Sequence, residues 1–439
     1  MHFDLAPLDL AIIGIYLLAM IALGAVLSRR IRFFKDYFLA GGVLTTPILV
    51  CTLVSTYYEL DVTFAVSESG YYYGVVAWTW LSRPYYIAII LAAFFLAKRL
   101  KRHETFMTLP DLLEHHYGLG TRIVGAVACF IYSLPITALA GMAVLFEILG
   151  WDRWLGLAIS VGVCAIYTMM GGLWADAISD TIQFALMCIS LAIAIPLALQ
   201  WVGGFDSVAS LPEEFLSGTG GLSPWIIVAW TIGALTVFVE PAFYQRIFAA
   251  KDHKSVTRAL LIGILLWAAY DWGVTLIGMI GRAAVEQGLL GEVEGRAALM
   301  HVTMNALPLG LRGLFIGGVL AAAMSSVDSY SLLASGNITY DIIHPLRKRS
   351  ISDRTLMRLT RFGVLVVMLL AAGASLWFER ITDAWVFMSG VLASIVFVPV
   401  MGGLLLRPRS GAGLASALSG FAALLVFHAV VHSVGEYDE

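Results

Sequence analysis

The chain has 439 residues, of which 60% are hydrophobic and 13% are charged, and its formal net charge is −3. Soluble domains are about a quarter charged, so this composition excludes an ordinary soluble globular protein and predicts an all-α protein of the lipid bilayer. We expect no nucleic-acid partner, and the sequence does not identify partner proteins.

Apolar stretches of about 20 residues, the length that crosses a bilayer, recur along the whole chain. We predict twelve transmembrane helices, at residues 8–28, 45–66, 74–97, 122–149, 153–172, 176–202, 223–246, 256–283, 308–341, 355–378, 381–406 and 411–434. The connections are too short for a soluble domain, so residues 1–439 are expected to form one membrane domain.

The first span is predicted to be a retained helix with its N-terminus outside. No basic residue precedes it, whereas Arg29 and Lys35 lie just after it, and cleaved signal peptides have the reverse order of charge. In this orientation most lysines and arginines, including Arg122 and Arg246, fall on the cytoplasmic side, as the positive-inside rule requires. Short loops and the lack of a targeting segment favour a bacterial inner (cytoplasmic) membrane.

Polar residues interrupt the second span at residues 54–61, where Tyr57, Glu59 and Asp61 lie. Carboxylates at mid-membrane depth require a cation, an opposite charge or water. The alternative is that this stretch is the tilted end of a helix at the outer interface.

In the seventh span, Glu240 directly precedes Pro241. A proline inside a helix removes a backbone hydrogen bond and frees carbonyl groups, so we expect a broken helix. The alternative is a plain proline kink with Glu240 near the cytoplasmic surface.

Two broken spans at corresponding places indicate an inverted-repeat transporter. Spans two to six, at residues 45–202, and spans seven to eleven, at residues 223–406, would form the 5+5 inverted-repeat core. Residues 1–37 and 411–439 would then hold the peripheral first and last helices.

The ninth span places Ser325, Asp328 and Ser329 on one helical face. Their hydroxyl and carboxylate oxygens suit a hard cation, whereas packing through small residues would explain the serines but not Asp328. Asp176 and Asp180 lie one turn apart at the start of the sixth span. The positive end of the helix dipole accounts for Asp176 better than for the deeper Asp180.

Arg83 is predicted near the middle of the third span, where a lone guanidinium must be paired. Its candidate partners are Glu59, Asp61, Glu240 and an anionic solute, so structural pairing and solute binding both remain open. Asp271, in the middle of the eighth span, is a further partner candidate with no assigned role.

Several other chemistries are disfavoured. The sequence has no Walker loop, serine-hydrolase elbow or dinucleotide-binding glycine fingerprint, which argues against an ATP-driven pump and against an enzyme. The four cysteines lie within predicted spans without C-x-x-C spacing, and we expect them to be packing residues.

Five segments resemble those of the sodium:solute symporter family, which includes carriers of proline, sugars, sialic acid and vitamins. They lie in the family's order at residues 38–42, 108–118, 171–183, 245–252 and 320–329. The resemblance covers nearly the whole chain and implies a leucine-transporter-type fold with alternating access around a midplane site.

The resemblance also implies where sodium would bind. The main site would use the carbonyls of Ser55, Tyr58 and Ala322 and the hydroxyls of Ser325 and Ser326. A further ion site, shared by some members, would use Asp180, Asp328 and Ser329. Sodium takes about five or six oxygen ligands, which unwound backbone and hydroxyl groups supply without excess charge.

For the solute we expect a site formed by Tyr57, Glu59, Asp61, Trp80, Arg83 and Glu240. Leu81 replaces an acidic residue of the family's sugar carriers and Glu240 replaces their asparagine, so an amino acid or a carboxylate is favoured over a sugar. Charges of both signs would also suit a zwitterion.

We therefore predict a sodium-coupled symporter that imports a small organic solute. One alternative is a membrane solute sensor that signals through a separate partner. Another is a proton-coupled symporter, for which carboxylates such as Glu59, Asp61 and Asp271 could serve, whereas the paired serines favour sodium. A channel is disfavoured because the polar residues cluster at the midplane and do not line a path.

Overall fold

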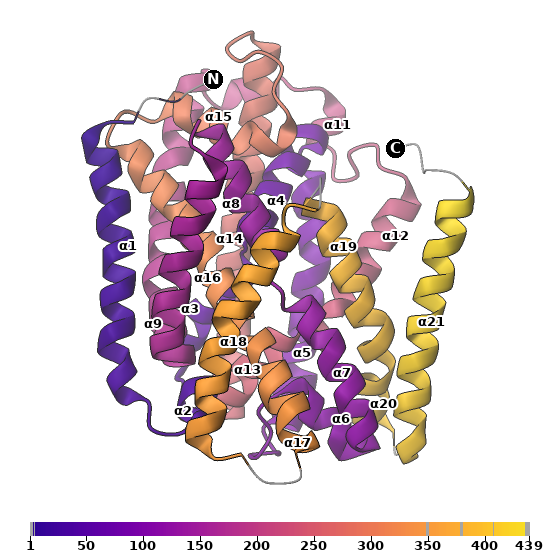
Figure 1. Ribbon diagram of the computed structural model, residues 1–439. Helices are drawn as coiled ribbons and strands as arrows, with labels where there is room; N and C mark the ends of the chain where they lie inside the picture. The colour runs from indigo at the N-terminus through magenta and orange to yellow at the C-terminus, as the bar shows by residue number, and fades with distance from the viewer. Residues whose placement is uncertain (1–2, 4, 348–350, 378–380, 407, 435–439) are drawn as a thin grey trace.

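The computed structural model describes residues 3, 5–347, 351–377, 381–406 and 408–434 (Figure 1). Within these ranges the protein consists of helices and has no strand; Leu44 and Ala250 form an isolated bridge. The long helices and their continuations are α1 (Pro7–Leu27), α3 (Thr46–Tyr57), α4 (Leu60–Tyr73), η3 (Ala77–Ser82), α5 (Arg83–Leu100), α7 (Leu119–Tyr132), α8 (Ile136–Ile148), α9 (Arg153–Val202), α12 (Pro224–Gly233), η4 (Ala234–Val239), α13 (Pro241–Ala249), α14 (His253–Glu286), α16 (Leu311–Gly336), η5 (Asn337–Ile343), α18 (Asp353–Ala374), α19 (Ile381–Leu392), η6 (Ala393–Phe397), α20 (Val398–Leu405) and α21 (Ser410–Val434).

Shorter helices connect these elements. They are η1 (Ser28–Arg30), α2 (Phe34–Leu39), η2 (Ala40–Gly42), α6 (Leu109–Tyr117), α10 (Phe205–Ala209), α11 (Glu213–Leu216), α15 (Gly295–Ala306) and α17 (His344–Leu346). The loop segment at residues 108–118 forms α6, whose first turn is capped by the Thr108 hydroxyl accepting from the Asp111 N–H.

Among the described residues, nine helices are long and apolar enough to cross a bilayer, or eleven spans if each of two bent pairs counts as one. The sequence predicts twelve, and the difference lies in α9, which joins the predicted spans at 153–172 and 176–202. Its 50 residues would extend about 75 Å if straight, far more than the hydrocarbon thickness of about 30 Å. The helix is in fact interrupted at Gly172, where φ is 50° and ψ is −150°.

Gly172 is required at that interruption. Its left-handed φ is costly for residues with a side chain, and a Cβ atom there would lie 2.3 Å from the carbonyl oxygen of Tyr37. The backbone of α2 therefore packs directly on the interruption in α9.

The two bent pairs are the spans in which sequence analysis expects broken helices. The second span bends by 60° between α3 and α4, and the seventh bends by 40° between η4 and α13. Tyr58 and Glu59 leave helical geometry at the first break, and Glu240 is extended before Pro241 at the second. The first break contains no glycine, and the freed carbonyl of Ser55 accepts a hydrogen bond from the Ser325 hydroxyl of α16.

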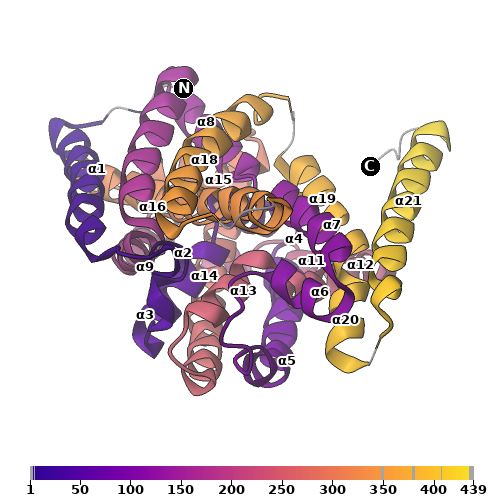
Figure 2. The same cartoon turned by 60° about the horizontal axis from the view of Figure 1, so that its bottom comes forward.

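The two ends of the chain lie on the outside of the bundle. Helices α1 and α21 form opposite edges in both views (Figures 1 and 2), and the most apolar windows of these helices are only 28% and 11% buried. Helix α16 is the most enclosed, with 83% of its window buried. In Figure 1, α1 begins and α21 ends at the same end of the molecule.

Candidate functional site

Two serines of α16 lie against the last turn of α3. The Ser325 hydroxyl is within hydrogen-bond distance of the carbonyl oxygens of Ser55 (3.1 Å) and Ala322 (2.9 Å), and the Ser326 hydroxyl is 3.3 Å from the Ala322 carbonyl. All four residues are fully buried. Four of the five residues expected to bind the main sodium ion therefore lie together.

The Ser55 carbonyl can accept a hydroxyl because the last four carbonyls of a helix have no partner within the helix. Helix α3 ends at Tyr57, and Tyr58 has φ of −97° and ψ of 64°, which turns the chain away from the helix axis. Tyr58, the fifth expected ligand, lies at this break. The local sequence thus produces both the break and the free carbonyl.

The phenol of Tyr58 points to Asp271 on α14. Tyr58 and Tyr86 of α5 both donate hydrogen bonds to the Asp271 carboxylate, which is 4% exposed. The mid-span carboxylate for which sequence analysis found no role therefore holds the broken second span against α5 and α14.

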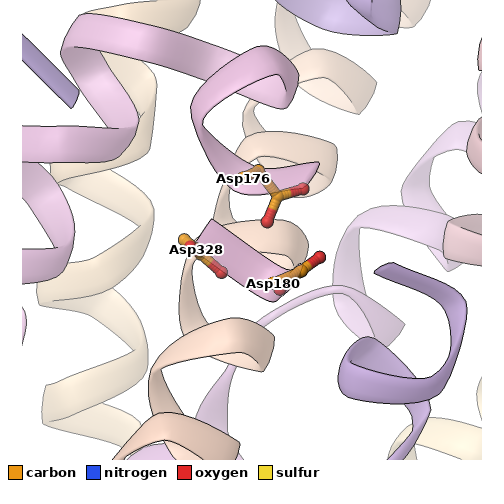
Figure 3. Close-up of side chains that lie close together, drawn as sticks. All are labelled: Asp176, Asp180 and Asp328. Atoms are coloured by element: carbon orange, nitrogen blue, oxygen red, sulfur yellow. The ribbon is translucent and has the colours of Figure 1, made fainter. Parts of the chain in front are cut away.

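Three buried carboxylates on α9 and α16 form a second group of candidate ligands. Ligand oxygens of Asp176, Asp180 and Asp328 lie within 4.8 Å of one another, and Figure 3 shows the side chains close together, two from α9 and one from α16. Thr52 donates to Asp180 at 2.5 Å, and Tyr167 donates to Asp328. One oxygen of Asp180, Oδ1, has no hydrogen-bond partner among the described residues.

Arg246 of α13 is the cation of this cluster. Its guanidinium forms an ion pair with Asp176 at 2.9 Å and donates to the hydroxyls of Ser329 and, at 3.0 Å, Thr56. Arg246, expected in a connection on the cytoplasmic side, lies within helix α13 and has a side chain that is only 1% exposed. The break before Pro241 redirects α13 into the packed protein, so residues after the proline still belong to the core.

The cluster carries an excess of negative charge. Three carboxylates and one guanidinium leave two formal negative charges without a bonded cation among the described side chains. Uncompensated charge at such depth is costly unless ions or protons neutralise it. Asp176 follows the Gly172 interruption by one turn, as the helix-dipole explanation requires, but its charge is met by Arg246.

Glu240 lies at the second break with three hydrogen-bond donors. The Tyr57 hydroxyl is 3.1 Å from Oε2, the Tyr330 hydroxyl is 3.2 Å from Oε1, and the Phe243 N–H is 2.6 Å from Oε2. Glu240 is 2% exposed, so it is enclosed by protein and does not lie on the protein surface. The structure brings Tyr57 and Glu240, two expected solute residues, into direct contact.

Arg83 and Trp80 lie elsewhere. Arg83 is exposed, and its guanidinium is 5.4 Å from the Trp80 ring centroid. The expectation that Arg83 pairs with Glu59 or Glu240 is therefore wrong; a long side chain can reach the surface and stack on an aromatic face instead. Glu59 is half-buried at the start of α4, and the Asp61 side chain lies outside the described part of the structure.

A second charge cluster lies beside α6. Arg122, also expected in a cytoplasmic loop, has a side chain that is only 7% exposed and forms ion pairs with Asp111 (3.0 Å), Asp341 (2.9 Å) and Glu114. Burial raises the pKa of the Asp111 carboxyl, and the Arg122 guanidinium opposes this shift. This network fastens α6 to α7 and η5.

Several site residues were not found by sequence analysis, among them Thr52, Thr56, Tyr167, Arg246 and Tyr330. Tyr167 and Tyr330 lie within apolar spans and have no local pattern that marks them. Arg246 could have been found, since a proline break inside a span indicates that the residues after it remain within the protein.

Comparison with known proteins agrees with this geometry. The model of the sodium:solute symporter family matches residues 37–412. The chain is 27% identical over 386 residues to an osmoregulated proline transporter of Bacillus subtilis, covering 83% of this chain and 77% of that protein. It is 24% identical over 434 residues to the sodium/proline symporter of Escherichia coli, covering 91% and 84% of the two chains.

A solved structure shares the fold. The chain matches the substrate-bound, outward-open structure of a Na+-coupled sialic acid symporter with a TM-score of 0.84 at 20% identity, over 98% of each chain.

Proposed function

The chain belongs to the sodium:solute symporter family, and we propose that its solute is an amino acid or a carboxylate in preference to a sugar. The protein is a sodium-coupled importer of a small organic solute, with Na+ as its coupling ion. Two of the relatives are proline carriers by name, which supports an amino-acid solute.

The observation that carries the proposal of sodium-coupled transport is the contact between the Ser325 hydroxyl and the Ser55 carbonyl. These groups are 3.1 Å apart across the break in the second span. A main sodium site here would use the carbonyls of Ser55, Tyr58 and Ala322 with the hydroxyls of Ser325 and Ser326. These oxygens are hard and mostly uncharged, which suits Na+.

A second sodium ion would bind Asp180, Asp328 and Ser329. Support comes from the unpartnered Oδ1 of Asp180 and from the two uncompensated negative charges of the carboxylate cluster. Ser55, whose carbonyl belongs to the main site, also has a buried hydroxyl with no hydrogen-bond partner among the described residues. This second sodium ion would reduce the formal charge of the cluster and Arg246 from −2 to −1.

The proposed architecture is twelve crossings with two inverted repeats, at residues 45–202 and 223–406. An even number of crossings agrees with α1 beginning and α21 ending at the same end of the molecule (Figure 1). Counting α9 as two crossings that meet at Gly172 raises eleven spans to twelve. The N-terminus would lie outside a bacterial cytoplasmic membrane, as the distribution of basic residues favours.

Coupling follows from where sodium would bind. An ion held by α3 and α16 stabilises one position of the broken helix, and this helix also carries Tyr57, which contacts Glu240. Sodium therefore raises the affinity for the solute, and by linkage the solute raises the affinity for sodium equally. The downhill entry of sodium then drives solute uptake.

Uptake into proteoliposomes tests the proposal. A panel of amino acids, carboxylates and sugars is measured with and without an inward sodium gradient, for wild type and Ser325→Ala/Ser326→Ala. We expect sodium-driven uptake that the double variant loses. The control Ser335→Ala removes another buried hydroxyl-to-carbonyl bond of α16, to Thr360, and should retain uptake. Uptake that is equal with and without the gradient would contradict the proposal.

A further inference from the structure

Glu240 is a deeply buried carboxylate to which no cationic side chain among the described residues is bonded. Its hydrogen-bond partners are the phenols of Tyr57 and Tyr330 and the N–H of Phe243. Among the described residues no lysine, arginine or histidine bonds to it, and the nearby Arg246 is engaged by Asp176. An ionised carboxylate in this setting calls for a positive partner.

Helix capping alone does not explain this residue. Capping α13 uses only the contact from the Phe243 N–H to Oε2, and shorter side chains such as Ser, Asn or Asp are the usual caps. The longer glutamate also reaches Tyr330, which contacts the other oxygen, Oε1. The side chain is thus held on both oxygens in one fixed position between α3, α13 and α16.

Further aromatic rings pack against the two tyrosines whose hydroxyls contact the carboxylate. The Tyr57 ring lies 6.1 Å from Phe243 and 5.7 Å from Trp267, and the Tyr330 ring lies 6.1 Å from Tyr132. Aromatic faces attract cations, most strongly where water is excluded. A carboxylate among tyrosines therefore favours a cation that is partly apolar, such as an alkylated ammonium group.

No arginine in the described part of the chain bonds to Glu240 or to its two tyrosines. Arg83 is exposed and stacks on Trp80, and Arg246 and Arg122 are both held by carboxylates. Glu240 is the charged group that bonds to both Tyr57 and Tyr330.

From this arrangement, and resting on the proposed function above, we propose that the transported solute carries a positively charged nitrogen held by Glu240. The rings of Tyr57 and Tyr330 would flank this ammonium group. A solute carboxylate is optional, whereas the ammonium group is the feature by which the site selects its solute.

The test compares four probes. L-proline carries an ammonium group and a carboxylate, choline carries an ammonium group without a carboxylate, and pyruvate and D-galactose carry no ammonium group. Sodium-dependent binding to purified protein and sodium-driven uptake are measured for wild type, Glu240→Gln and Tyr330→Phe. We expect an ammonium probe to bind, with affinity falling about 10-fold to 100-fold in Glu240→Gln, because the variant loses the ion pair to either ammonium group and, for L-proline, a charge-assisted hydrogen bond. Tyr330→Phe should lower affinity less, because the charge remains.

Stabilisation by sodium reports that each variant is folded. Binding of pyruvate or D-galactose alone, or binding of an ammonium probe that Glu240→Gln leaves unchanged, would overturn the inference while leaving sodium-coupled transport intact. Absence of sodium-dependent binding for both ammonium probes would also overturn it. Failure of the proposed function is distinguishable, since sodium would then neither stabilise the protein nor drive any uptake.

Discussion

Arg246 and Asp176 form an ion pair of 2.9 Å in which both side chains are almost completely buried, 1% and 0% exposed. The pair connects α13, the second half of a broken span, to α9 just after its interruption at Gly172. Through Ser329 and Thr56 the same guanidinium also reaches α16 and α3. One side chain therefore ties together both broken spans and the two helices that hold the carboxylate cluster.

We expect Arg246→Gln to reduce stability and uptake more than Asp176→Asn. Removing the guanidinium leaves three carboxylates without a bonded cation, whereas Asp176→Asn leaves two beside the guanidinium. Breaking a buried ion pair from one side costs about 3–5 kcal/mol. Thermal unfolding at low and high sodium measures this difference, and high sodium should recover part of the loss in Arg246→Gln. Equal losses in the two variants, unaffected by sodium, would refute this explanation.

The sodium dependence of uptake should show two ions. We predict a Hill coefficient of about 2 for wild type and about 1 for Asp180→Asn, since the number of coupled sites limits the Hill coefficient. Glu286→Gln, at an exposed pair with Arg282, is the charge-matched control and should behave as wild type. A Hill coefficient of about 1 for wild type would contradict the second sodium site.

Asp271→Asn should weaken sodium binding without changing the coupling ion. The carboxylate accepts hydrogen bonds from Tyr58 and Tyr86. An amide oxygen at this position would be a weaker acceptor for these hydroxyls, which should reduce stability by about 1–3 kcal/mol. Because Tyr58 lies at the break, the concentration of sodium for half-maximal uptake should rise. Uptake driven by a pH gradient without sodium that wild type shows and Asp271→Asn loses would instead indicate that Asp271 carries a coupling proton.

Gly172→Ala should destabilise the protein, and Gly162→Ala should not. Both glycines lie in α9, but a Cβ at Gly172 would meet the Tyr37 carbonyl at 2.3 Å, whereas no atom lies within 4 Å of a Cβ at Gly162. Replacing a helical glycine by alanine at an open site stabilises a helix by about 0.5–1 kcal/mol. Melting temperatures of the two variants check this, and similar values would show that Gly172 is not needed for the interruption.

The breaks and the serine pair could be predicted from the sequence because their signals are local. Pro241 within an apolar span and the polar run around Tyr57 each mark a place where the backbone leaves the helix. Ser325 and Ser326 lie on a regular helix, so their position relative to Asp328 follows from helical periodicity alone.

The partners of Arg83 and Arg246 could not be predicted in this way. Depth in the membrane indicates that a guanidinium needs a partner, but the direction of the side chain depends on how the helices bend and pack. Arg83 stacks on a neighbouring tryptophan at the surface, whereas the 40° bend before α13 carries Arg246 to Asp176, 70 residues away in sequence. Long-range packing decided both outcomes.

The central claim, that sodium binds between the Ser55 carbonyl and the hydroxyls of α16, is tested most directly by sodium binding to purified protein without solute. Wild type, Ser325→Ala and the control Ser335→Ala are titrated with sodium in a buffer without choline, in which potassium keeps the ionic strength constant. Thermal stabilisation is the readout. The account predicts that Ser325→Ala needs about 10-fold more sodium, the effect of losing one ligand worth about 1.4 kcal/mol, while Ser335→Ala matches wild type. Identical sodium titrations for wild type and Ser325→Ala would contradict it.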